Sequence, residues 1–136
     1  RVLLNNKEQI DIEIQVTSSE YWAERTLFYL GKMFVDQLKP GEDYQKLEKC
    51  IHVGILNFTL FDDQEYYSRF HFWSDQGRKM YSDKFEIHTL ELPKLAKHEY
   101  PETELLKWLQ FINAESKEEF EMAAEKANIL RRRMRI

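Results

Sequence analysis

Residues 10–16 read Ile-Asp-Ile-Glu-Ile-Gln-Val, and this stretch decides which fold to expect around it. Apolar side chains at Ile10, Ile12, Ile14 and Val16 alternate with polar ones at Asp11, Glu13 and Gln15. Successive side chains of a strand point to opposite faces, so the alternation predicts a strand with one buried face. Residues 2–4 and the turn signal Asn5-Asn6 predict a second strand that pairs with it as a hairpin.

A helix is expected directly after this strand. Thr17 and Glu20 have the spacing of a capping box, and the helix should run to about Leu38, before Pro40-Gly41. We expect one apolar face to be buried, formed by Ala23, Leu27, Leu30, Phe34 and Leu38. Gly31 lies inside the helix, where we expect another element to pack closely.

The rest of the chain predicts three strands and then two helices. Residues 51–58 are apolar on both faces, as in a central buried strand, and residues 66–73 and 85–92 predict two more strands around a turn at 75–78. Helices are expected over residues 102–112 and from the Ser116/Glu119 capping box to about Leu130. The order β-β-α-β-β-β-α-α predicts one α/β domain with a mixed sheet, its core at about residues 1–95 and its C-terminal helices at about 102–131.

Composition narrows the classes of function. The 136 residues carry a net charge of −4. This charge argues against a simple DNA-binding module that holds nucleic acid by neutralising its phosphates. It argues less strongly against a nuclease. The single cysteine, Cys50, allows no intramolecular disulfide and favours a reducing compartment, so we expect a cytoplasmic protein. No apolar run approaches the roughly 20 residues of a membrane span. The start at Arg1, without Met or a signal-like segment, suggests a fragment.

The polar row of residues 11–15 is the main candidate for chemistry. Mg²⁺ and Mn²⁺ prefer hard oxygen ligands, which Glu13, the main-chain carbonyl of Ile14 and a further carboxylate could supply. Gln15 could orient a water or a phosphate oxygen, but it cannot supply the positive charge of a lysine. On the pattern alone, a solvent-facing row is the more common explanation.

Several blocks of sequence, in the same order, resemble one known family. They are Asp11-Ile-Glu-Ile-Gln-Val16, a helix with Tyr21 and Arg25-Thr-Leu-Phe-Tyr29, Leu38-Lys-Pro-Gly-Glu-Asp-Tyr44, Ile51-His-Val-Gly-Ile-Leu-Asn-Phe58 with Leu60-Phe-Asp62, and Glu86-Ile-His-Thr-Leu-Glu-Leu-Pro-Lys94. This succession resembles the Rpn-type recombination-promoting nucleases, also labelled PD-(D/E)xK nuclease family transposases. The resemblance extends from about Arg1 to Ile112.

The resemblance implies a restriction-endonuclease-like α/β fold and a metal-dependent nuclease centre. The family motif is an Asp on one strand and Glu-x-Lys on the next; here Glu13 takes the metal-binding position and Gln15 the last position. The resemblance also implies Mg²⁺ or Mn²⁺ as cofactor, DNA as partner and an association with mobile elements and recombination. The expected Asp would precede Arg1, outside this chain, and the family's first helix is absent too.

Other polar residues allow alternative interpretations. His52, His71 and His88, with Cys50, could form a zinc site, but hydrogen-bonded sheet histidines and a buried thiol are favoured. Arg25 resembles a family position and could face a DNA phosphate, whereas an ion pair to Glu20, Glu24 or Asp36 is at least as compatible with the sequence. Lys32 has the same two interpretations.

Two further segments are assigned structural roles. The basic tail at residues 131–135 could contact a nucleic-acid backbone, but a solvated helix end is favoured. Aromatic residues at 66–73 could stack on bases, but a sheet face packed under helices is favoured; the residues are Tyr66, Tyr67, Phe70, Phe72 and Trp73.

The sequence therefore predicts a divalent-metal-dependent DNA endonuclease with Glu13 and Gln15 as catalytic residues. The metal ligands would be Glu13, the Ile14 carbonyl and the upstream Asp, with Asp11 as a further ligand or a supporting residue. The alternatives are a catalytically silent DNA-binding or protein-interaction domain of the same fold, and a structural oligomerisation domain, which would carry a large apolar patch on one helix. The oligomeric state, including a homo-oligomer, and the choice between DNA and RNA stay open.

Overall fold

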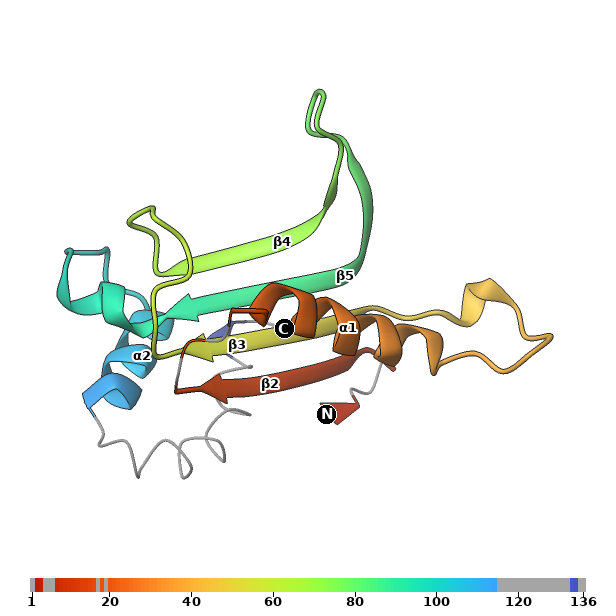
Figure 1. The fold of residues 1–136 in the computed structure, drawn as a ribbon, viewed down its shortest axis with the longest axis horizontal. Helices are drawn as coiled ribbons and strands as arrows, with labels where there is room; N and C mark the ends of the chain where they lie inside the picture. The colour runs from red at the N-terminus through yellow and green to blue at the C-terminus, as the bar shows by residue number, and fades with distance from the viewer. Residues whose placement is uncertain (1, 4–6, 17, 19, 115–132, 135–136) are drawn as a thin grey trace.

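The computed structural model describes residues 2–3, 7–16, 18, 20–114 and 133–134. Its centre is one five-stranded sheet in the order β1-β2-β3-β5-β4 (Figure 1). The strands are β1 Val2–Leu3, β2 Gln9–Gln15, β3 Cys50–Leu56, β4 Tyr67–Trp73 and β5 Met80–Glu91. The sheet is mixed, as predicted: β2, β3 and β5 are parallel neighbours, whereas β1 pairs antiparallel with β2 and β4 with β5.

The order of the strands follows from their connections. β2 and β3 are parallel neighbours joined by a crossover that contains the helix α1 (Trp22–Val35) and the short 3-10 helix η1 (Tyr44–Lys46). Parallel strands need such a long connection, whereas a turn at Asp75–Arg78 is enough for the antiparallel pair β4 and β5. β5 begins at Met80, five residues before the predicted start, because the hairpin extends beyond the part of the sheet that pairs with β3.

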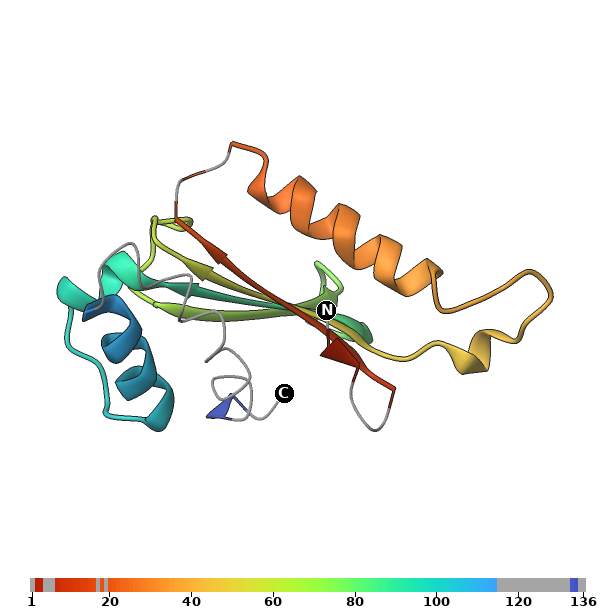
Figure 2. The ribbon, with the colours of Figure 1, turned by 90° about the horizontal axis from the view of Figure 1, so that it is seen from below.

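Helices cover the two faces of the sheet separately, and Figure 2 shows α1 and α2 (Glu104–Ala114) on opposite sides of it. The larger core lies between the sheet and α2. It consists of Ile10, Ile51, Val53, Ile55, Tyr66, Leu90, Leu92, Leu106, Leu109 and Ile112. A smaller cluster beneath α1 contains Leu30, Met33 and Cys50. β3 is buried along its whole length, which confirms the prediction of a central strand with two apolar faces.

The buried face of α1 only partly matches the predicted one, with Leu30 common to both. The buried residues are Trp22, Thr26, Leu30 and Met33, while Ala23 and Leu27 are exposed. The observed stripe lies about one residue earlier along the helix, because the large ring of Trp22 packs onto the sheet. The helix begins after Tyr21, which has no capping side-chain hydrogen bond; Thr17 of the predicted capping box lies outside the described residues.

Gly54 of β3 is the position that allows this approach. A Cβ atom there would lie 2.8 Å from Cζ2 of Trp22, a distance that no real side chain tolerates without a shift. The prediction of close packing at Gly31 is wrong, since a Cβ atom there would meet nothing within 4 Å. The glycine that the packing requires is therefore on the strand beneath α1, not within the helix.

The aromatic strand is only partly in the core. Tyr66 is buried, but Phe70, Phe72 and Trp73 are 39 %, 49 % and 52 % exposed, so the expected packing under helices is wrong for these three. β4 is an edge strand, and α1 lies over β2 and β3 rather than over β4 (Figure 1). Pairing between β4 and β5 is irregular after Phe70, where the hairpin curls away from the sheet.

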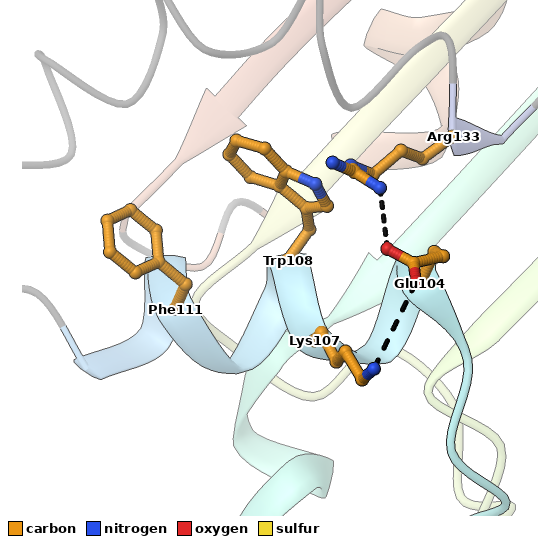
Figure 3. A pocket seen from close by; sticks show the side chains of 5 residues that line it. All are labelled: Glu104, Lys107, Trp108, Phe111 and Arg133. Atoms are coloured by element: carbon orange, nitrogen blue, oxygen red, sulfur yellow. Dashed lines mark hydrogen bonds and ion pairs between the residues drawn. The ribbon is translucent and has the colours of Figure 1, made fainter.

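The C-terminal part is described only in α2 and at residues 133–134, so the helix predicted from Ser116 lies outside the described residues. Arg133 lies against α2, where its guanidinium pairs with Glu104 at 2.6 Å and stacks over the Trp108 ring at 4.9 Å (Figure 3). These contacts differ from the predicted solvated helix end. With Lys107 and Phe111 the three residues line a pocket of about 330 Å³.

Candidate metal and phosphate site

The polar row of β2 lies on the face of the sheet that α1 covers. Asp11, Glu13 and Gln15 are all half-buried, and the Glu13 side chain is only 22 % exposed. Their apolar neighbours Ile10, Ile12 and Ile14 belong to the core on the other face, as the alternation predicts. The row is therefore not an open, solvent-facing strand surface, which was the more common explanation for the pattern alone.

Arg25 of α1 reaches down to this row. One guanidinium nitrogen lies 2.7 Å from Oε1 of Glu13, and the guanidinium also lies 5.5 Å from the centre of the Tyr29 ring. The partner is therefore neither a phosphate nor one of the three carboxylates considered from the sequence, Glu20, Glu24 and Asp36. The side chain is 40 % exposed, so it stays accessible from solvent while it holds Glu13.

His52 of β3, which the sequence offered only as a possible zinc ligand with Cys50 and two other histidines, lies beside this row. It pairs in register with Asp11, and its Nε2 lies 3.8 Å from Oδ2 of Asp11 and 3.5 Å from Oε2 of Glu13. Among the described residues, Asp11, Glu13 and His52 form the group whose ligand atoms could hold a metal ion, all within 4.8 Å of one another. The prediction of a hydrogen-bonded sheet histidine is wrong here, because neither ring nitrogen of His52 has a hydrogen-bond partner in the described part of the chain.

The surrounding charges keep Glu13 ionised. The neighbouring His52 imidazole makes the largest contribution to lowering the pKa of Glu13; burial acts to raise this pKa, and the Arg25 guanidinium adds to the lowering. At 3.5 Å the contact to His52 is electrostatic rather than a well-formed hydrogen bond. A carboxylate with a lowered pKa is a ready ligand for a cation near neutral pH.

The backbone of β2 turns the Ile14 carbonyl away from β3. The Gln15 carbonyl accepts a hydrogen bond from the amide of Asn57, on the β3 side, and successive carbonyls of a strand alternate between its two edges. The Ile14 carbonyl therefore points to the edge where β1 pairs. On that edge Leu3 pairs with Gln9 and Val2 with Ile10, because β1 is antiparallel to β2. Each step toward the N-terminus of β1 therefore brings the pairing one residue closer to Glu13.

The remaining candidate residues lie elsewhere. Lys32 is exposed in the last turn of α1, and Cys50 is a buried thiol, as predicted. His88 and His71 both bond to Glu86, each through Nε2 at 2.7 Å. Phe85 and Ile87 pack against the cluster beneath α1, so the alternate residues Glu86 and His88 face α2. His88 and His52 therefore lie on opposite sides of the sheet. The histidines and Cys50 do not converge on a zinc site among the described residues.

A buried ion pair closes the end of the sheet next to this row. The carboxylate of Glu91, fully buried, accepts hydrogen bonds from the amides of Leu60 and Phe61 at 2.6 and 3.0 Å and binds Lys94 at 3.0 Å. Lys94 also bonds to Asp63 at 2.9 Å. Burial acts to lower the pKa of Lys94, but the two carboxylates raise it. These contacts hold the loop after β3, so they belong to the fold and not to the site.

The sequence matches one known protein family. The family model of the PD-(D/E)XK nuclease family transposases matches residues 2–136. The chain belongs to the PD-(D/E)XK nuclease family transposases. Neither a search of curated proteins nor a search of solved structures found a match. The mixed sheet with flanking helices is the α/β fold expected for a PD-(D/E)XK nuclease.

Membership in this nuclease family gives the polar row a context that the pattern alone lacks. Nucleases with this motif generally use divalent metals, and their substrate is DNA. Within the described residues, no helix is long and apolar enough to cross a bilayer. No signal in a single sequence marks His52 as a member of the site, because the pairing of Asp11 with His52 depends on the register between β2 and β3.

Proposed function

We propose that this PD-(D/E)XK domain is a divalent-metal-dependent DNA endonuclease whose centre is built around Glu13. The observation that carries the proposal is the position of Glu13, half-buried under α1 between a guanidinium and an imidazole. Such a carboxylate is shielded from solvent yet still reachable. The ion would be Mg²⁺ or Mn²⁺, bound by Glu13, the Ile14 carbonyl and the Asp that the family motif places on the preceding strand.

The backbone geometry supports this set of ligands. The Ile14 carbonyl and the β1 register both lead to the same edge of β2, next to Glu13. An ion held there would activate water as a nucleophile and would stabilise the charge that develops on a phosphate. In the proposed site Glu13 holds the ion, and the Gln15 amide orients the water or a phosphate oxygen.

Arg25 can supply the positive charge that Gln15 lacks. A guanidinium donates paired hydrogen bonds that match a phosphate, and Arg25 already lies above the motif glutamate. In the proposed mechanism it binds a phosphate oxygen of the substrate while its neighbour Glu13 holds the ion. Lys32, about two helical turns further along α1 and exposed, would contact the DNA backbone only at a distance from the reacting phosphate.

The direct test is cleavage of plasmid DNA by the full-length protein with Mg²⁺ or Mn²⁺. We expect Glu13→Ala to abolish cleavage and Gln15→Ala to lower it by about 10²-fold, a typical loss for a group that acts on the transition state. Gln15→Lys, which restores the more common motif residue, should stay active. Glu24→Gln removes an exposed carboxylate of α1 and serves as the matched control. Cleavage by Glu13→Ala at the wild-type rate would refute the proposal.

A second candidate is a protein-interaction or oligomerisation domain of the same fold without catalytic activity, and one observation favours it. Large apolar side chains of α1 and of the residue before it are exposed: Tyr21, Leu27, Phe28 and Val35, at 64 %, 50 %, 68 % and 65 %. A patch of this kind is typical of a protein interface. Under this alternative Phe28→Glu would change the sedimentation of the protein or its capture of a partner, and Glu13→Ala would change neither.

A further inference from the structure

We propose that Asp11, Glu13 and His52 form a second cation site on the β3 side of Glu13, selective for ions that accept an imidazole nitrogen, such as Mn²⁺, Co²⁺ and Zn²⁺. It shares Glu13 with the proposed nuclease centre but uses neither the Ile14 carbonyl nor the Asp of the preceding strand. All three ligands lie within the described residues. Its existence therefore does not depend on whether the protein cleaves DNA.

The first support is the condition of His52. Its side chain is 1 % exposed, and neither Nδ1 nor Nε2 has a hydrogen-bond partner among the described residues. A buried polar atom without a hydrogen bond costs about 1–3 kcal/mol, so such atoms are few, and a bound ion is one of the explanations for them. The ring is held by an edge-to-face contact with Trp22, 5.7 Å between centroids, and Nε2 faces the two carboxylates.

The distances between the ligand atoms suit one ion. Ligands about 2.1 Å from an ion lie about 3 Å apart when adjacent in an octahedron and about 4.2 Å apart when opposite. Nε2 of His52 lies 3.5 Å from Glu13 and 3.8 Å from Asp11, between these two values. The three ligand atoms together stay within 4.8 Å. A small inward movement of the two carboxylates would therefore complete the coordination.

Arg25 does not block this position. Its guanidinium contacts Oε1 of Glu13, whereas Oε2 is the oxygen that faces His52. An ion on the His52 side can therefore use Oε2 while the ion pair to Oε1 persists. Binding at Nε2 leaves the ring proton on Nδ1.

The chemistry of the ligands decides which ions are preferred. Imidazole binds borderline transition metals well, whereas Mg²⁺ and Ca²⁺ favour oxygen ligands and keep much of their water. Three protein ligands also leave coordination positions for water, as in catalytic rather than structural metal sites. The expected order is therefore Zn²⁺ and Co²⁺ above Mn²⁺, with Mg²⁺ the weakest.

The experiment is a titration of the 136-residue chain with Co²⁺, Zn²⁺ and Mg²⁺, followed by calorimetry and, for Co²⁺, by its visible absorption. Loss of a residue that only supports a ligand costs about 10–100-fold in affinity, so His52→Phe should lower Co²⁺ and Zn²⁺ affinity by about 100-fold or more and leave Mg²⁺ affinity unchanged. His98→Phe, at an exposed histidine, is the matched control. Circular dichroism establishes that each variant is folded.

A measurement on the unaltered chain covers the case in which His52→Phe fails to fold. In ¹⁵N spectra of the imidazoles, Zn²⁺ should shift Nε2 of His52 and leave the rings of His71 and His88 in place. The proposed site is wrong if a folded His52→Phe variant keeps the wild-type Co²⁺ affinity, or if Zn²⁺ does not change the chemical shift of His52. If the protein cleaves DNA but His52 does not bind Zn²⁺, only the second cation site is wrong. If His52 binds Zn²⁺ but the protein does not cleave DNA, only the nuclease proposal is wrong.

Discussion

Arg25 of α1 and Glu13 of β2 form a 2.7 Å ion pair between a helix side chain and the motif glutamate. The two side chains are 40 % and 22 % exposed, so the pair is neither fully buried nor fully solvated. The guanidinium places a positive charge next to the position proposed for a metal ion. A substrate phosphate and a metal ion would therefore compete for, or share, the same small volume around Glu13.

Removal of this guanidinium should strengthen metal binding. A partly exposed pair is worth about 0.2–1 kcal/mol, so Arg25→Gln should raise Mn²⁺ affinity by up to about fivefold while it weakens DNA binding. Calorimetry with Mn²⁺ and a DNA-binding titration at fixed salt measure the two effects. Lys84→Gln removes an equal charge from β5, beyond β3, and should change neither by a comparable amount. A weaker Mn²⁺ affinity in Arg25→Gln would contradict the placement of the ion beside Glu13.

A methyl group at position 54 should displace α1. In Gly54→Ala the new Cβ atom would lie 2.8 Å from the Trp22 ring, and overpacking of this kind typically costs about 1–3 kcal/mol. Urea denaturation gives the loss directly. Gly31→Ala is the matched control in α1, because open space surrounds that position; it should stabilise the protein by about 0.5–1 kcal/mol. Equal effects of the two substitutions would show that Trp22 does not pack on Gly54 in solution.

Glu86 should make the protein sensitive to acid. Burial alone would raise the pKa of Glu86, but hydrogen bonds from His88 and His71, with Lys49 nearby, lower it from 4.5 to about 2. Because the folded pKa lies below the unfolded one, the ionised carboxylate stabilises the fold fully above about pH 4.5, and this contribution fades as the pH falls toward 2. At about 1.4 kcal/mol per pKa unit, it amounts to about 3 kcal/mol.

The measurement is the free energy of unfolding of wild type and Glu86→Gln between pH 2.5 and 6. The gap between the two proteins should be largest at pH 6 and should shrink steadily toward pH 2.5. Glu102→Gln, at an exposed carboxylate, should run parallel to wild type. A constant gap between wild type and Glu86→Gln over the whole range would show that the carboxylate is not held ionised by its histidines.

Replacing Lys94 alone should destabilise the protein strongly, whereas replacing Lys94 and Glu91 together should cost less. Lys94→Met leaves the fully buried carboxylate without its cation, which typically costs about 3–5 kcal/mol. The double variant Glu91→Gln/Lys94→Met removes the uncompensated charge and keeps an oxygen for the amides of Leu60 and Phe61, so much of the loss should be recovered. Thermal or urea denaturation of wild type, Lys94→Met, Glu91→Gln and the double variant forms the cycle, and additive losses would argue against the pair.

Much of the architecture could be predicted from local patterns. The alternation at residues 10–16 and the apolar run at 51–58 both became strands of the kind expected, because strand faces follow directly from side-chain period and burial. The buried stripe of α1 was displaced by a residue, because the size of Trp22 and the absence of a Cβ atom on Gly54 decide how the helix docks. Neither effect is visible in the helix sequence by itself.

The sequence by itself determined the strand with Glu13 and Gln15, the mixed α/β fold and the nuclease family. Only the tertiary structure decided what surrounds Glu13. Arg25 lies 12 residues and His52 39 residues further along the chain, and both reach Glu13 because α1 crosses over the sheet and β2 pairs in parallel with β3. Local propensity acts over a few residues, whereas strand register and helix docking bring distant side chains together through packing.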